Sequence, residues 1–247
     1  MTSSGWADKT PTVLPSLILC AALGTVTGNP IGDFQAGVAA AQAGDDPGAE
    51  ALLRKAEGEA PGWPLPDIEL AQLALRSGRG SAAQALAKRA TDLDPQKPRA
   101  WHLLSLASEA AGDLPAAEAA DRQAVALRPD YQEARQHLAD VLWNEGKRGP
   151  AIDLYLELTA AHPEDLALLA TVATAEEADG RVAAAEQALR VLIESQPKVA
   201  AWHRRLGRLL QGEGRDAAAS REFALADRLA GERRTMRRLR PLLPSRR

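Results

Sequence analysis

Histidine and cysteine side chains are the groups in this sequence that could hold a metal or act as acid–base or nucleophilic catalysts. The chain has one cysteine, Cys20, and four histidines, His102, His137, His162 and His203. The histidines lie at least 25 residues apart and no second cysteine accompanies them, so the spacing typical of a zinc site is missing. We therefore expect no metal site, no bound cofactor and no disulfide within the chain.

Motifs of the common catalytic sites are also missing. The segment Gly146–Gly149 reads GKRG and lacks both the leading glycine and the Ser or Thr that follows the lysine of a P-loop. Neither a G-x-S-x-G nucleophile turn nor an H-E-x-x-H zinc-protease motif occurs. Carboxylates are frequent, but in a helical array they mostly form solvated faces. The sequence therefore predicts no catalytic residues and a protein that is not an enzyme.

The composition favours closely packed helices. Of the 247 residues, 45% are hydrophobic but only 4% are aromatic, and alanine and leucine supply most of the apolar content. Strands favour β-branched and aromatic residues, whereas alanine and leucine favour helices. The formal net charge is −3, which argues against binding to nucleic acid through neutralisation of phosphates.

Proline and glycine recur with a period of 34 residues, which is the strongest pattern in the chain. The prolines in register are Pro61, Pro95, Pro129, Pro163 and Pro197. The glycines in register are Gly44, Gly78, Gly112, Gly146, Gly180 and Gly214. Each glycine follows a helix-length segment, where a left-handed residue can turn the chain, and each proline follows a second segment and stops that helix.

Two columns of small residues repeat with the same period. One is alanine throughout: Ala49, Ala83, Ala117, Ala151, Ala185 and Ala219. The other holds Gly37, Ala71, Ser105, Ala139, Ala173 and Gly207. Helices approach closely only where side chains are short, because a bulky residue would overpack the contact. The pattern predicts two antiparallel helices per unit, each pair stacked on the next.

The segment Ala100–Pro129 resembles the tetratricopeptide repeat (TPR) consensus. The signature places are taken by Trp101, Leu104, Gly112, Ala117, Ala124 and Pro129. The resemblance covers residues 30–233 and implies an all-α fold, a right-handed superhelix (α-solenoid) of six helix-turn-helix repeats. The implied repeats are 30–63, 64–97, 98–131, 132–165, 166–199 and 200–233. The first departs most, with Asp33 at an apolar place, and the last has Gly231 where a proline is expected.

The N-terminal segment, residues 1–29, contains an apolar run, Val13–Val26, that is too short to span a membrane. One interpretation is a helix that caps the first repeat, with Cys20 as a buried small hydrophobe. The alternative is a signal peptide, or a lipoprotein leader with Cys20 as the lipidated residue. Against these alternatives stand the single basic residue ahead of the run, Lys9, and the large Leu19 before the cysteine.

The C-terminal segment, residues 234–247, is predicted to be a basic cap or tail. From Gly231 onward the chain carries seven arginines and one acid, Glu232. We expect a polar, solubilising end to the array, since solenoid ends need a polar outer face. The alternative is an anionic contact through these arginines, but no aromatic residue is interleaved to stack on a base.

The TPR resemblance also implies where a partner binds. In that family the first helices of the repeats line a concave groove in which ligands lie. The positions that fall on the corresponding helix face are Phe34, Val38, Ile68, Leu75, Leu106, Gln136, Asp140, Trp143, Asn144, Glu177, Arg204 and Arg208. Trp143 is expected either as an exposed binding residue or as packing between helices, while Trp101 and Trp202 are expected in the core.

The sequence therefore predicts a cytoplasmic adaptor that binds an extended segment or helix of another protein in the groove and supports complex assembly, without a membrane span. The alternative is a periplasmic lipoprotein, anchored through Cys20, similar in layout to the pilotins that assist assembly of secretins or type IV pili. That alternative depends on layout alone.

Overall fold

The computed structural model describes residues 28–239, with side chains described up to Glu232. Within these residues the chain is all-α, as the repeat pattern predicts, and has no strand. Cys20, the apolar leader and the arginines after Glu232 lie outside the described residues or side chains. The helices are α2 (Pro30–Gln42), α3 (Asp46–Glu59), α4 (Pro64–Arg76), α5 (Gly80–Leu93), α6 (Pro98–Ala110), α7 (Leu114–Leu127), α8 (Gln132–Asn144), α9 (Arg148–Ala161), α10 (Leu166–Ala178), α11 (Val182–Ser195), α12 (Ala200–Gly212) and α13 (Asp216–Leu239).

The glycine column ends the first helix of each pair. All six glycines have a positive φ, between 69° and 83°, which residues with a side chain rarely adopt. At Gly112 the backbone N–H donates to Glu109 O at 2.8 Å, and the N–H of Asp113 donates to Ser108 O at 2.8 Å. These bonds satisfy carbonyls at the end of α6 and reverse the chain, while the side chain of Asp113 caps α7 by accepting from Ala116 N.

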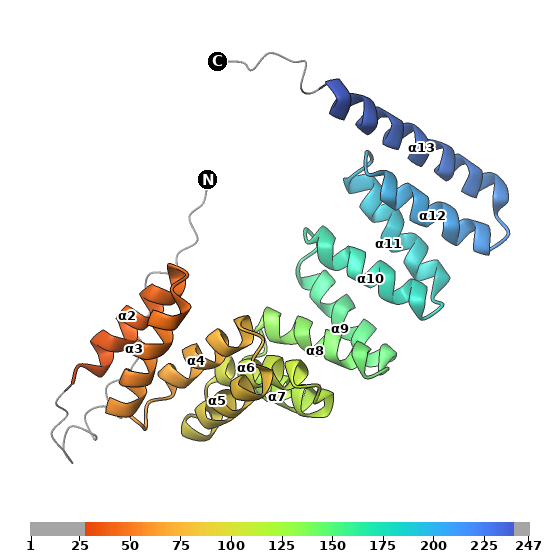
Figure 1. Ribbon diagram of the computed structural model, residues 1–247. Coiled ribbons are helices and arrows are strands. Elements are labelled where there is room, and N and C mark those ends of the chain that lie inside the picture. Colours follow the sequence, from red (N-terminus) through yellow and green to blue (C-terminus); the bar gives the residue numbers. More distant parts are fainter. Residues whose placement is uncertain (1–27, 240–247) are drawn as a thin grey trace. The chain divides into compact units, whose positions relative to one another are not determined.

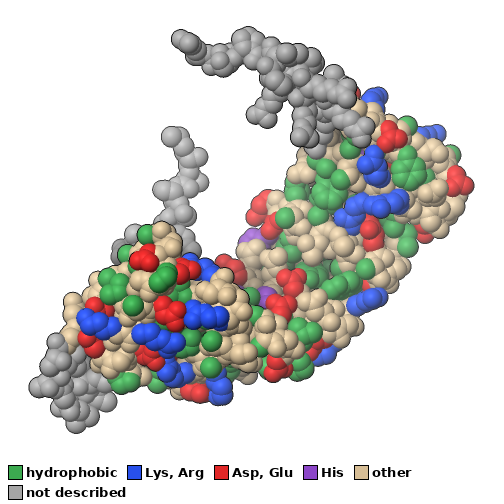
Figure 2. Space-filling model, in the orientation of Figure 1, with side chains coloured by type: hydrophobic (Ala, Val, Ile, Leu, Met, Phe, Trp, Pro, Cys, Tyr) green, Lys and Arg blue, Asp and Glu red, His purple; other side chains and the backbone are tan. Residues whose placement is uncertain are grey.

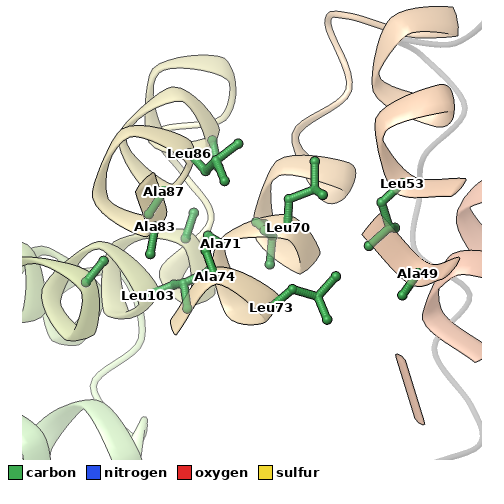
Figure 3. Packing of buried hydrophobic residues seen from close by; sticks show 14 residues of the cluster. Ala49, Leu53, Leu70, Ala71, Leu73, Ala74, Ala83, Leu86, Ala87 and Leu103 are labelled. Atoms are coloured by element: carbon green, nitrogen blue, oxygen red, sulfur yellow. The ribbon is translucent and has the colours of Figure 1, made fainter. Parts of the chain in front are cut away.

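Successive helices pack as antiparallel pairs, α2–α3, α4–α5, α6–α7, α10–α11 and α12–α13 (Figure 1). Both columns of small residues are buried. At Gly207 a Cβ would lie only 2.7 Å from the ring of Phe223, so the helices there are too close for a side chain. Figure 3 shows the same arrangement around α4, where Ala71 and Ala74 face Ala83 and Leu103.

The chain divides into two compact units, one ending at Val141 and the other beginning at Leu142, so that α8 crosses the division. The first unit contains one continuous core cluster built from α3 to α6, and the second contains another built from α10 to α13. Among the described helices, none is both long enough and apolar enough to cross a membrane.

Candidate functional site

An open hollow of about 820 Å³ lies over the first helices of the N-terminal unit. Residues of α2 and α4 form part of its wall, and the beginnings of α6 and α8 and the loop before α8 complete it. The lining residues are Val38, Ala41, Gln42, Glu69, Gln72, Leu73, Arg76, Arg99, Arg128, Asp130, Tyr131, Gln132 and Glu133. The hollow is therefore a polar surface with a small apolar part, and it carries charges of both signs.

Ion pairs and ring contacts fix several of these side chains. Arg99 of α6 reaches α4, where it bonds Glu69 at 2.8 Å and Gln72 at 2.9 Å. The guanidinium of Arg128 lies 3.4 Å from the ring centre of Tyr131. Burial raises the pKa of the Tyr131 phenol above its ordinary value, so this ring stays neutral. A ligand here would meet groups that are already held in place, which lowers the entropic cost of binding.

The predicted groove residues of the first unit divide between surface and core. Val38 lines the hollow. Phe34 packs on the ring of Trp63 at 4.8 Å, while Leu75 and Leu106 are half-buried against the core. Ile68 is 0% exposed, so the prediction that it faces the groove is wrong. An apolar side chain at the border of groove and core is more stable in the core.

On α8, which crosses the division between the units, Gln136 and Asp140 of the first unit are half-buried and Asn144 of the second is exposed.

In the second unit the groove candidates Trp143 and Glu177 each contact an arginine side chain. Trp143 is half-buried, and the guanidinium of Arg148 on α9 lies 5.4 Å from its ring centre, within the range of a cation–π contact. Arg205, which the sequence analysis did not select, pairs with Glu177 of α10 at 3.1 Å.

The two arginines proposed as an anionic anchor differ in their surroundings. Arg204 pairs with Asp227 of α13 at 2.9 Å, on the second helix of its own pair. Arg208 is exposed on α12.

The two tryptophans expected in the core are only half-buried. Trp101 donates its indole N–H to Pro95 O at 2.8 Å, and Trp202 donates to the side chain of Gln196 at 3.1 Å. These bonds place each ring beside the loop that precedes its helix. An indole N–H that leaves water needs an acceptor, and the loop supplies one.

A buried histidine–carboxylate cluster lies elsewhere in the first unit. Nδ1 of His102 (α6) is 2.8 Å from one oxygen of Asp121 (α7), and Nδ1 of His137 (α8) is 2.6 Å from the other. Nε2 of His137 is 2.9 Å from Glu109 of α6. Asp121 is 0% exposed. Donor groups suited to a metal therefore meet here, contrary to the expectation drawn from histidine spacing.

The protonation of His137 depends on its burial and on its two carboxylate neighbours. Its pKa is raised above the ordinary value: burial acts most strongly and would lower it, but the hydrogen bonds and charges of Asp121 and Glu109 together outweigh burial.

The sequence spacing contains one signal that could have indicated these histidine–carboxylate contacts. Asp121 follows His102 by 19 residues, and Glu222, which pairs with His203 at 2.7 Å, follows that histidine by 19 as well. A helix hairpin brings such positions face to face.

A model of the tetratricopeptide repeat matches residues 68–135 and 137–200, together more than half of the chain. No curated protein matches the chain.

Three solved structures illustrate the structural similarity. One is the MamA protein of Desulfovibrio magneticus (from residue 41 to the end), with a TM-score of 0.59, 19% identity, and coverage of 67% of this chain and 94% of that one. Another is YrrB, described as a TPR protein with an unusual peptide-binding site (TM-score 0.62, 16% identity, 72% and 91%). A third is PilF of Pseudomonas aeruginosa (0.63, 16%, 81% and 91%). At these identities the similarity concerns the fold alone.

Proposed function

The chain belongs to the tetratricopeptide repeat family, and on that premise we propose that it is a non-enzymatic adaptor that binds an extended segment of another protein. TPR proteins are generally protein-interaction scaffolds. The observation that carries the proposal is the hollow over α2, α4, α6 and α8, which is wide, open and lined from several consecutive first helices.

The chemistry of the hollow indicates the kind of segment that fits. Val38 and Ala41 offer a small apolar area, whereas Gln42 and Glu133 offer hydrogen bonds and charge. Arg76 and Glu69 also line the hollow but are already paired, with Asp46 at 2.6 Å and with Arg99 at 2.8 Å. The visible face in Figure 2 likewise mixes acidic, basic and apolar side chains without a large patch of one kind. A polar peptide of mixed charge is the partner that such a surface accommodates, because its charges meet opposite ones at the rim.

For the second unit we propose Trp143 and Arg208 as partner contacts. Tryptophan and arginine are enriched among the residues that dominate binding energy at interfaces. Arg204 is a weaker candidate than the sequence suggested, because a partner would have to replace its ion pair with Asp227.

Site-specific photo-crosslinking tests where the partner binds. A photoreactive phenylalanine derivative placed at Gln72, exposed on α4 in the hollow, should form a crosslink to a discrete partner in cells of the native host. The same derivative at Gln123, exposed on the second helix α7, is the matched control and should give none. Both variants must melt with the parent chain. A partner captured from Gln123 and not from Gln72 would contradict the proposal.

Location is a separate proposal. We expect a protein with the adaptor function to be located in the cytoplasm. The pilotin-like alternative requires a periplasmic chain anchored through Cys20. We expect the intact mass of the protein isolated from its host to equal that of the chain without cleavage at Cys20. A chain that begins at a lipidated Cys20 would instead support the envelope role.

A further inference from the structure

Three helices bring two imidazoles and a carboxylate to one point in the first unit, although no short segment of sequence holds more than one of them. One ring nitrogen of His102, one of His137 and a carboxylate oxygen of Asp121 lie within 4.8 Å of one another. The carboxylate lies between the imidazoles, at 2.8 and 2.6 Å. Each side chain is also sheltered, with Asp121 at 0% exposure and both histidines at 12%.

We propose that His102, Asp121 and His137 bind a zinc ion. Two imidazole nitrogens and one carboxylate oxygen are a donor set that zinc accepts readily. With zinc–ligand bonds of about 2.0–2.1 Å in a tetrahedral site, the ligand atoms stand roughly 3.3 Å apart. The three atoms here lie within 4.8 Å of one another, so rotations of the side chains would have to draw the more distant pair together by up to about 1.5 Å to admit the ion. Water would take the fourth position.

The surroundings of His137 favour this use of its ring. Nε2 of His137 faces Glu109 at 2.9 Å, and a carboxylate in that place holds the proton on Nε2. Without metal, Nδ1 faces an oxygen of Asp121 at 2.6 Å and the hydroxyl oxygen of Ser105 at 3.2 Å, so zinc would displace the proton held there and take the Nδ1 lone pair. Ligand histidines of metal sites commonly donate their second ring N–H to such a carboxylate, which fixes the tautomer and orients the ring.

Helix packing also supports a site rather than a chance cluster of surface groups. Ser105 of α6 donates its hydroxyl to Ala117 O of α7 at 2.8 Å, next to the cluster, and so ties the two helices together. A dication would offset the negative charge of the buried carboxylate, which is unfavourable away from water. Because His137 is on α8 and the other ligands are on α6 and α7, the ion would fasten α8 to the preceding helix pair.

Zinc titration of the full-length chain tests the proposal. The protein should be free of affinity tags, carry Cys20→Ser to remove its only thiol, and be freed of metal with a chelator that is then dialysed away. We expect calorimetry to show one zinc per chain and the melting temperature to rise with zinc. Cobalt(II), used as a spectroscopic substitute, should give the intense visible bands of a tetrahedral site.

Matched variants assign the ligands. His137→Gln should weaken zinc binding by roughly 100-fold or more, and Glu109→Gln by about 10–100-fold, since outer carboxylates tune affinity to that extent. His162→Gln removes a histidine of the second unit and should leave the affinity unchanged. Helical circular dichroism must match the parent for each variant, and His102→Gln replaces His137→Gln if that chain unfolds.

Absence of zinc binding by the parent chain would overturn the proposal. So would equal affinities of the His137→Gln and His162→Gln proteins, or a cobalt spectrum that matches the hydrated ion. The parent spectrum alone decides the matter if neither ligand variant folds.

Discussion

Replacing Asp121 with alanine is expected to lower the free energy of unfolding of the zinc-free protein by about 3–5 kcal/mol, because it breaks a buried network by removing its central partner. Asp121 is fully buried and faces the Nδ1 atoms of both His102 and His137. Without it, Nδ1 of His102 loses its carboxylate partner and Nδ1 of His137 keeps the longer 3.2 Å contact with Ser105, and water cannot easily replace a carboxylate at that depth.

Urea unfolding followed by circular dichroism, in the presence of a chelator, measures this effect. Asp92→Ala is the matched control, since Asp92 lies exposed on α5 and pairs with Lys88 one turn away, and its loss should cost no more than about 0.5 kcal/mol. Hydrogen exchange should localise the damage in the Asp121→Ala chain to α6, α7 and α8. Equal stability of the two variants would mean that the cluster contributes little to the fold.

Truncating Ile68 to alanine is the second large change, with an expected loss of about 2–5 kcal/mol in the free energy of unfolding. The side chain is 0% exposed and belongs to the core cluster of the first unit. Its removal deletes buried methyl groups and leaves a cavity that neighbouring helices can close only in part.

Ile31→Ala provides the control for this prediction. Ile31 is also an isoleucine in a first helix, but it is 47% exposed. Its truncation should change stability by less than about 1 kcal/mol. If Ile68→Ala melts with the parent while weakening capture of the crosslinked partner, Ile68 would after all belong to the binding surface.

The sequence by itself determined the fold class and the positions of the turns. The positions of the turns follow from the local covalent geometry of glycine and proline. A residue at a φ near +80° is nearly always glycine, so Gly112 and its counterparts mark where the first helices end. A proline has no N–H to donate, so Pro129 and its counterparts mark where the second helices cannot continue. Small residues at fixed spacing then identify the faces along which helices meet.

Tertiary structure alone decided which side chains of different repeats meet. Helical periodicity places Ile68 on the border between groove and core, and only the packing of α4 among its neighbours shows that the residue is buried. Arg205 was overlooked for the same reason, since its partner Glu177 lies on another helix, 28 residues away.

The histidine cluster shows the same limit most clearly. His102 and His137 are 35 residues apart, which argues against a metal motif when the chain is read as a line. In a stack of helix pairs with a 34-residue period, that separation instead places the two rings on adjacent first helices, and the hairpin between α6 and α7 supplies Asp121 between them. Contacts between repeats depend on the offset at which helices pack, and that offset comes from the shapes of many side chains together.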